Sequence, residues 1–220
     1  MKTPIPKKQF TIQERIELTI KNLLRKVGID IKRIRIPREN SSETSRCRMS
    51  LSDYCQGNGL DLGPGGDPIS PSAVRVDLPE PYTQVGNLPV QLGGDAQDLY
   101  WFKDNCLDYV FSSHLLEDFE DTEKVLQEWM RVLKIGGKLV IYCPDEQRYR
   151  AHCAKTGQDY NLNHFHDTFS LAMVKTCIVN IGNCKVLHEK DNIGDYCWEI
   201  VAEKTVASNL NYKRGNWLQS

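Results

Sequence analysis

Three acidic residues follow or interrupt short apolar segments in the first half of the chain. Asp61 lies within segment 59–62, Asp77 ends segment 73–77, and Asp95 follows segment 90–92. Gly63 and Gly65 come directly after the first segment, where a turn without side chains lets the backbone approach a ligand closely. A glycine turn that only redirects the chain is the alternative. Because open α/β sheets bind ligands at the carboxyl ends of their strands, the three acids favour a nucleotide-type site.

The apolar segments that carry these acids alternate with helical patterns. Apolar runs predict strands at 59–62, 73–77, 90–92, 107–111, 138–143, 184–188 and 196–203. Helices are predicted at 49–55, from Asp121 to the Gly136-Gly137 pair, and from Leu171 to Gly182. A strand-helix-strand order makes neighbouring strands parallel, whereas the short turn between the last two strands makes them antiparallel.

Length and composition indicate one globular domain with a short appendage. The chain has 220 residues, of which 40% are hydrophobic and 26% charged. No apolar run approaches the roughly 18 residues of a membrane span, and no signal peptide is visible, so we expect a cytoplasmic protein. Eight cysteines occur without a C-x-x-C pair, which indicates reduced, mostly buried thiols and no metal site.

Basic residues are concentrated at the N-terminus. Residues 1–38 contain 11 Lys and Arg but 3 Asp and Glu, and the acidic remainder argues against nucleic-acid binding. Residues 11–27 have the periodicity of an amphipathic helix. This arm is either a solvated basic tail or a peripheral contact with an anionic membrane surface, such as the inner face of the cell membrane, or with a partner. Residues 39–46 are polar and are interpreted as a linker.

Five motifs in order resemble class I S-adenosylmethionine-dependent methyltransferases. They are Leu60 to Gly65 (LDLGPG), Val76-Asp77, Gly94-Asp95-Ala96, Leu107 to Val110 (LDYV) and Leu133 to Leu139 (LKIGGKL). The resemblance covers roughly residues 50–204 and implies an α/β, Rossmann-like doubly wound fold. Its sheet has seven mostly parallel strands with a terminal antiparallel strand, to which the N-terminal amphipathic helix is added. The expected division is an arm and linker at 1–47, a catalytic domain at 48–207 and a polar tail at 208–220.

The resemblance also implies where S-adenosylmethionine binds. Gly63 and Gly65 would lie against its amino-acid and ribose parts, and the Asp77 carboxylate would accept from both ribose hydroxyls. Asp95 and Ala96 would meet adenine, and Asp61 would order the turn or contact the cofactor's ammonium group. The full set of expected cofactor residues is Asp61, Gly63, Pro64, Gly65, Asp77, Leu78, Asp95, Ala96 and Ser112.

A dinucleotide is the competing ligand for this glycine turn. The pattern here is Gly63-x-Gly65-Gly66-x-Pro68, so a proline stands where the dinucleotide fingerprint needs a third small residue. No long helix follows to hold a pyrophosphate, and a sulfonium cofactor carries no phosphate that would need one. The pattern therefore favours S-adenosylmethionine. The interval from Asp61 to Asp77 is shorter than usual in either family.

His114, which follows the fourth predicted strand, is the candidate general base for a hydroxyl acceptor. Alternatively, it only lines the site. Where the family often has a Glu-His pair, this chain has Glu117-Asp118. Residues 145–167 have no clear periodicity but are rich in cationic and aromatic side chains, which form either an acceptor site or a solvated face. From this stretch we expect substrate contacts from Arg148, Tyr149 and His152, and weaker catalytic candidates in His164 and His166, which are not expected to bind a metal.

The overall pattern is similar to methyltransferases of bacterial surface-polysaccharide and sugar pathways. It predicts O-methylation of a sugar or glycan. Methylation of another small metabolite or natural product is the second interpretation, and a non-catalytic cofactor-binding scaffold is the third. The oligomeric state does not follow from the sequence.

Overall fold

The computed structural model describes residues 42–81 and 84–207, all of which belong to the compact unit Glu39–Ser220. The amphipathic helix expected at 11–27, the rest of the basic arm and the tail at 208–220 lie outside the described residues. Within the described ranges, no helix is long and apolar enough to cross a membrane.

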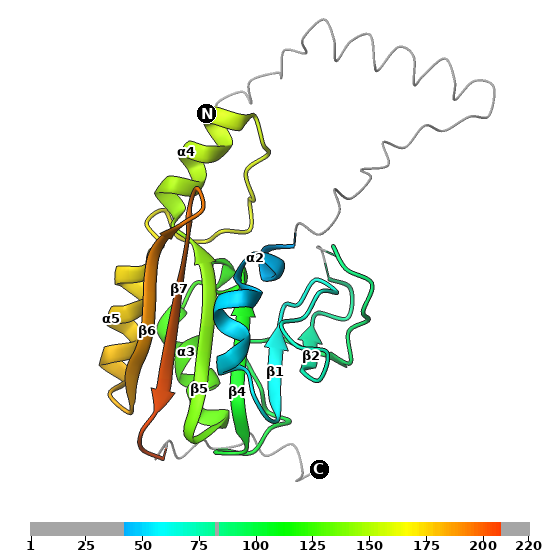
Figure 1. Ribbon diagram of the computed structural model, residues 1–220, viewed down its shortest axis with the longest axis vertical. Coiled ribbons are helices and arrows are strands. Elements are labelled where there is room, and N and C mark those ends of the chain that lie inside the picture. The colour runs from blue at the N-terminus through cyan, green and yellow to red at the C-terminus, as the bar shows by residue number, and fades with distance from the viewer. Residues whose placement is uncertain (1–41, 82–83, 208–220) are drawn as a thin grey trace, which may run out of the picture. The chain divides into compact units, whose positions relative to one another are not determined.

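A seven-stranded sheet forms the centre of the unit, in the order β3-β2-β1-β4-β5-β7-β6 (Figure 1). The pairs from β3 to β5 are parallel, and β7 runs antiparallel to both β5 and β6. This confirms the predicted Rossmann-like, mostly parallel fold. The strands are β1 (Gly59–Leu62), β2 (Val74–Asp77), β3 (Leu92–Gly93), β4 (Leu107–Ser113), β5 (Leu133–Pro144), β6 (Cys184–Ile193) and β7 (Cys197–Lys204).

Helices cover the two faces of this sheet with separate apolar clusters. On one face, α3 (Thr122–Val132) and α5 (Leu171–Ile181) pack over the strands, with Trp129 and Trp198 fully buried. On the other, α2 (Glu43–Leu51) packs over β4 and β5, and α4 (Glu146–Thr156) joins the same cluster from the carboxyl edge of the sheet (Figure 1). Short 3-10 helices at Ser52–Tyr54 and Leu116–Asp118 complete the set of described helices. The carboxyl ends of β1, β2, β4 and β5 thus meet at one edge, beside α2 and α4.

The end of α3 corrects a prediction. The Gly136-Gly137 pair was expected to stop this helix, but the helix ends at Val132 and both glycines lie in β5. Instead, the buried Lys204 of β7 donates from Nζ to three carbonyl oxygens at the helix end, those of Met130, Arg131 and Leu133, at 2.7–3.2 Å. An ammonium group satisfies carbonyls that lack partners within the helix, and its charge complements the helix dipole.

Three other segments also differ from the sequence prediction. Residues 43–46, interpreted as linker, form the first turn of α2, whose cap Ser42 accepts a hydrogen bond from the Ser45 N–H. Residues 145–167 contain α4, capped by Asp145 and ended by Gly157 in left-handed geometry. This helix buries few side chains, chiefly Glu146, Tyr149 and Cys153, so its sequence lacks a long apolar period. The third strand, expected at 90–92, is the two-residue β3.

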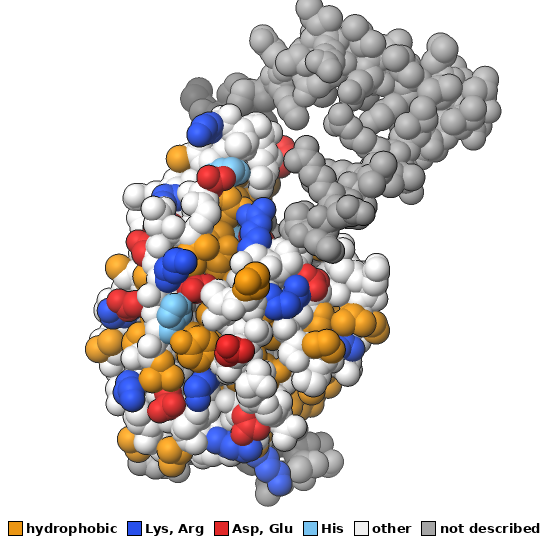
Figure 2. Space-filling model, in the orientation of Figure 1, with side chains coloured by type: hydrophobic (Ala, Val, Ile, Leu, Met, Phe, Trp, Pro, Cys, Tyr) orange, Lys and Arg blue, Asp and Glu red, His pale blue; other side chains and the backbone are white. Residues whose placement is uncertain are grey.

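The surface and the cysteines fit an ordinary globular unit. On the face seen in Figure 2, basic and acidic side chains are interspersed with apolar ones, and neither sign of charge forms a patch.

All eight cysteines are free, and Cys47, Cys55, Cys143, Cys153 and Cys197 are buried. The prediction that most of the thiols are buried is confirmed.

Candidate active site

The glycine turn after β1 is built by backbone contacts with a later segment. Gly63, Gly65 and Gly66 all have positive φ angles of 54–81°. The carbonyl oxygen of Gly65 accepts from the N–H groups of Val85 and Gly86, at 2.7 and 2.9 Å. A Cβ on Gly66 would lie 2.5 Å from the carbonyl oxygen of Gly86. The turn therefore requires glycine for its conformation and for this close approach.

Helix α2 holds the loop that follows the turn. Arg48 donates from Nη2 to Asp67 Oδ1 at 2.6 Å and to the carbonyl oxygen of Pro68 at 3.0 Å, and Ser42 Oγ also bonds to Asp67. These contacts hold in place a loop that has no crossover helix of its own. The N-terminus of α2 is thereby brought to the glycine turn.

A cavity of about 210 Å³ opens between the turn, the carboxyl ends of β2 and β4, and the start of α2. A second cavity, of about 300 Å³, lies at the opposite edge of the sheet around Asp108 and Gly136. We place the site in the first cavity because ligands of open α/β sheets bind at the carboxyl edge. It is lined by Ser42, Glu43, Thr44, Gly63, Pro64, Gly65, Asp77, Pro81, Val85, Ser113, His114, Leu115 and Asn161.

Asp61 and Asp77 hold different positions relative to this cavity. Asp77 lines it, with Oδ1 accepting from the Leu78 N–H at 2.8 Å, and the Leu78 side chain is half exposed. Asp61 lies behind the turn, fully buried, and its Oδ2 accepts from the Ile69 N–H at 2.6 Å. Burial raises the pKa of Asp61 to about 8. Its contact fits the expectation that Asp61 orders the turn.

The other expected cofactor residues do not line the cavity. Asp95 caps its own turn by accepting from the Gln97 N–H at 2.9 Å. Ala96 is buried, and its carbonyl oxygen accepts from Trp129 Nε1 at 2.8 Å. Ser112 is also buried, whereas Ser113 reaches the cavity. Successive side chains on a strand point to opposite faces, so the choice of Ser112 missed the lining serine by one position.

His114 projects from a strained backbone position between acidic side chains. Its φ angle is 52°, which is uncommon for a residue other than glycine and clusters at functional sites. Nε2 lies 3.4 Å from Glu43 Oε2 and 3.4 Å from Cys197 Sγ, and Nδ1 lies 3.6 Å from Glu117 Oε1. Burial is the main cause that lowers the pKa of His114 to about 3. The imidazole is therefore neutral at neutral pH.

Glu43, His114 and Cys197 bring three metal-ligating atoms within 4.8 Å of one another. The Arg46 guanidinium, however, lies 3.2 Å from Glu43 Oε2, the same oxygen that faces His114. A cation is thus already placed on the carboxylate that a metal ion would use. We therefore assign no metal ion to this cluster.

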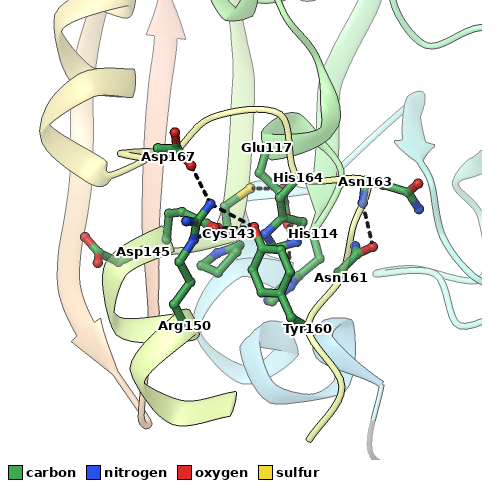
Figure 3. Close-up of polar contacts among 12 residues, drawn as sticks. His114, Glu117, Cys143, Asp145, Arg150, Tyr160, Asn161, Asn163, His164 and Asp167 are labelled. Carbon is green, nitrogen blue, oxygen red and sulfur yellow. Dashed lines mark hydrogen bonds and ion pairs between the residues drawn. The ribbon is translucent and has the colours of Figure 1, made fainter. Parts of the chain in front are cut away.

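A row of buried ionisable groups continues from His114 toward the surface (Figure 3). Glu117, at 1% exposure, has its Oε1 3.7 Å from Nε2 of His164. His164 Nδ1 lies 2.8 Å from Oε2 of Glu146, which is fully buried. Glu146 Oε1 accepts from Arg150 Nε at 2.6 Å, and Arg150 contacts the exposed Asp167. His164 therefore belongs to a buried network that is linked to His114 through Glu117.

His166 lies in the same loop but serves a different purpose. Its Nε2 is 3.1 Å from Thr122 Oγ1 and 2.9 Å from the carbonyl oxygen of Phe119. These contacts hold the loop against the start of α3. His166 lines neither the cavity nor the buried row.

The structure places the expected substrate residues outside the cavity lining. Arg148 pairs with Asp191 and Asn192 in the β6–β7 hairpin. The ring centroid of Tyr149 lies 4.9 Å from that of His164, so Tyr149 packs against the buried row rather than against the cavity. His152 Nδ1 lies 3.3 Å from an oxygen of Asp195.

Six of the residues that sequence reasoning missed carry polar or ionisable side chains on which the description of the site depends; they line the cavity, belong to the buried row or, in the case of Cys197, contact His114. Glu43 and Glu146 each stand directly after a capping residue, Ser42 and Asp145, and those caps were the available signals. Other residues come from segments far apart in the sequence and had no local signal. The six are Glu43, Ser113, Glu117, Glu146, Asn161 and Cys197.

Comparisons with known proteins find matches to methyltransferases in part of the chain. The family model described as "Methyltransferase domain" matches residues 60–141. Phosphoethanolamine N-methyltransferase 2 of Caenorhabditis elegans is 32% identical over 89 residues, which is 38% of this chain and 20% of that protein. The chain thus spans about a fifth of the length of this curated relative.

Two solved structures share the fold. The PH0226 protein from Pyrococcus horikoshii is 20% identical, with a TM-score of 0.59, covering 90% of this chain and all of the other. A SAM-dependent methyltransferase from Thermotoga maritima is 16% identical, with a TM-score of 0.53, over 73% of this chain and 91% of the other. The fold is that of class I methyltransferases. Residues 60–141 match the model of a methyltransferase domain, and the cofactor that this match implies is S-adenosylmethionine.

Proposed function

We propose that the protein transfers the methyl group of S-adenosylmethionine to a small polar acceptor bound beside His114. One observation carries this proposal. The glycine turn, Asp77 and the neutral imidazole of His114 line one cavity at the carboxyl edge of the sheet. Methyl transfer is an in-line displacement, so the protein's main task is to hold donor and acceptor at attack distance and exclude water.

The donor would occupy the side of the cavity formed by β1 and β2. Gly63, Pro64 and Gly65 offer backbone without bulky side chains, and the Asp77 carboxylate faces the same space. This carboxylate would accept from the ribose hydroxyls. Asp95 and Ala96 remain our candidates for the adenine end, although they do not line the cavity among the described residues.

His114 would act on the acceptor as general base. A hydroxyl is a poor nucleophile until its proton is removed, and a neutral imidazole can take that proton. Glu43 and Asn161 line the same space and could bind neighbouring polar groups of the acceptor. A sugar or glycan hydroxyl is our first acceptor class because this part of the lining is polar.

An amine is the second acceptor class. The curated relative is named as a phosphoethanolamine N-methyltransferase, and Glu43 places a carboxylate beside His114 that would attract a cationic amine. Such an acceptor would also lose a proton to His114 before attack. The two classes therefore differ in the acceptor atom and share the site.

Calorimetry with S-adenosylmethionine, followed by a labelled-methyl screen, tests the proposal. We expect binding, and then label transfer to activated sugars or to phosphoethanolamine, which separates the two acceptor classes. Absence of binding at millimolar cofactor would refute both the enzyme and the cofactor-binding scaffold, and would leave a domain that only keeps the fold. With an acceptor in hand, His114→Ala should lose about 10²-fold or more in turnover at unchanged cofactor affinity. His188→Ala is the matched control, since His188 contacts Glu199 at 2.8 Å and does not line the cavity.

A further inference from the structure

The carboxyl group of Glu117 lies between two imidazoles. Its Oε1 is 3.6 Å from Nδ1 of His114 and 3.7 Å from Nε2 of His164. Oε1 is fully buried and has no hydrogen-bond partner among the residues that the structure describes, whereas Oε2 accepts from Cys143 Sγ at 3.3 Å. A buried polar atom without a partner costs free energy. This one is placed where a small approach of either imidazole would make a hydrogen bond.

The row has a cavity end and a surface end. His114 lines the cavity, and at the other end Glu146 meets Arg150, whose side chain is 46% exposed. Between them, Glu117 and His164 are 1% and 3% exposed in their side chains. Ionisable groups at such depth are rare unless paired, and their clustering beside a cavity marks functional sites.

We propose that Glu117, His164 and Glu146 form a relay that carries a proton from His114 to the protein surface. This inference rests on the proposed function, in which His114 takes a proton from the acceptor. It adds a second role for the protein interior, namely to return His114 to a neutral state without leaving a charge in the core. The three residues act through His114 and are positioning residues.

When the acceptor is a hydroxyl group, each proton that the relay moves has a named donor and a named acceptor. The acceptor oxygen bonds to the methyl carbon, the carbon–sulfur bond breaks with its electron pair on sulfur, and the acceptor proton goes to Nε2 of His114. Protonated Glu117 passes the proton on Oε1 to Nε2 of His164, whose Nδ1 proton goes to Glu146. Glu117 Oε1 then takes the proton on Nδ1 of His114. His114 and His164 end as their other neutral tautomers, and one proton leaves the buried Glu146 for water by way of the hydroxyl of the partly exposed Tyr160, which bonds to Glu146. A flip of each imidazole ring restores the starting tautomers before the next turnover.

The charge state of the two carboxyl groups agrees with these roles. Burial, with Asp118 and Glu146 nearby, raises the pKa of Glu117 well above its usual value, so it can donate a proton. Hydrogen bonds from Tyr160, Arg150 and His164 overcome the effect of burial and lower the pKa of Glu146. The ionisable groups that face the row from the surrounding elements are Glu43, Arg46, Asp118, Tyr142, Cys143, Tyr149, Arg150, Tyr160, Tyr196 and Cys197.

Substitutions that cut the row while sparing nearby bonds provide the test. In His164→Asn, the amide can replace Nδ1 toward Glu146 but leaves nothing at the position of Nε2. Glu117→Gln keeps the size of the side chain and removes its exchangeable acidic proton. His166→Asn is the matched control, the same change two residues along in the same loop, where the histidine bonds Thr122 and Phe119.

Carbon-13 NMR of the full chain, labelled at glutamate carboxyl carbons, gives a measurement that needs no acceptor. Glu117 is the signal lost in Glu117→Gln. Its titration midpoint should move by at least about one pH unit in His164→Asn, as for coupled groups, and should stay unchanged in His166→Asn. An unchanged midpoint in His164→Asn, in a chain that still melts cooperatively and binds S-adenosylmethionine, would overturn the relay.

Kinetics supply the second measurement once an acceptor is known. Glu117→Gln and His164→Asn should each lower kcat by about 10-fold or more, with the KM for S-adenosylmethionine unchanged and the pH profile of kcat altered. His166→Asn should keep the wild-type pH profile. Wild-type profiles in all three variants would refute the relay, whereas failure of the wild-type chain to bind S-adenosylmethionine would refute the proposed function itself.

Discussion

Nδ1 of His114 and Oε1 of Glu117 lie 3.6 Å apart, behind the wall of the cavity and away from bulk water. Nε2 of His114 lies 3.4 Å from both Glu43 Oε2 and Cys197 Sγ, and His114 lines the cavity. The imidazole thus has polar neighbours at both ring nitrogens. Its usefulness as a base depends on the protonation state that burial imposes.

The pKa of His114, lowered to about 3, predicts an unusual pH dependence of turnover. A base is active when deprotonated, so activity should fall only as pH drops through its pKa. We expect no loss of kcat/KM attributable to His114 between pH 8 and pH 5, whereas an ordinary histidine would lose activity near pH 6.5. Initial rates across this range check the prediction. An acidic limb near pH 6.5 that disappears in His114→Gln would contradict it.

Gly66→Ala should disrupt the glycine turn. The new methyl would lie 2.5 Å from the carbonyl oxygen of Gly86, and the residue would keep a φ of 81°. Gly194→Ala provides the control, because Gly194 has a φ of 58° but nothing within 4 Å of the added carbon. Both variants incur about 1 kcal/mol of left-handed strain, and only Gly66→Ala adds the clash. Calorimetry should show lost cofactor binding in Gly66→Ala alone; equal affinities would refute the close-approach argument.

Asp77→Ala should weaken S-adenosylmethionine binding by about 10- to 100-fold. Loss of hydrogen bonds to a charged group costs about 1.5–3 kcal/mol, which corresponds to that range. Glu120→Ala removes an exposed acid that does not line the cavity and should leave the dissociation constant unchanged. Isothermal titration measures both. If Asp77→Ala binds as tightly as the wild type, the ribose role is wrong.

Asp61 should make the protein less stable as pH rises. Its pKa in the fold is about 8, above the usual 3.8, so the folded state holds the proton that the unfolded state releases. The free energy of unfolding should therefore fall between about pH 4 and pH 8 from this group. Asp61→Asn cannot ionise and should show a shallower fall in urea midpoints over the same range. If the urea midpoints of the wild type and of Asp61→Asn fall in parallel with pH, the raised pKa of Asp61 is wrong.

The basic arm gives a prediction about location. If residues 1–38 contact an anionic membrane surface, their deletion should abolish binding to phosphatidylserine-containing vesicles and spare cofactor affinity. Co-sedimentation and calorimetry provide the two measurements. Vesicle binding that survives the deletion would eliminate the membrane role.

The side of the cavity formed by the glycine turn and Asp77 was predictable because its signals are local. Gly63 and Gly65 follow a buried strand and Asp77 ends the next, so two short segments identify one edge of the sheet. The order of apolar runs also predicted the parallel pairing of β4 with β5 and the antiparallel pairing of β6 with β7, whereas the whole seven-stranded fold was implied by the resemblance to methyltransferases. Ser112 was chosen instead of the lining Ser113 because periodicity gives alternation without fixing its phase at a strand end.

The rest of the site depends on contacts between distant segments. Cys197 reaches His114 only because β7 inserts between β5 and β6, and Glu117 reaches His164 only because the 161–167 loop folds back over the sheet edge. The end of α3 has the same origin, since Lys204 is more than 70 residues from the carbonyls that it satisfies. No periodicity or cap in the sequence encodes such pairings.

The matched region, residues 60–141, contains the glycine turn and Asp77 but stops before Glu146, Asn161, His164 and Cys197, and starts after Glu43. The side of the cavity opposite the glycine turn combines Ser113, His114 and Leu115 of the matched region with Ser42, Glu43, Thr44 and Asn161 from polypeptide on either side of it. In the proposed function, selection can preserve the methyl-donor site within the matched region while the flanking segments diverge. Acceptor choice would then evolve by changes at the start of α2 and at Asn161 without altering the turn that follows β1.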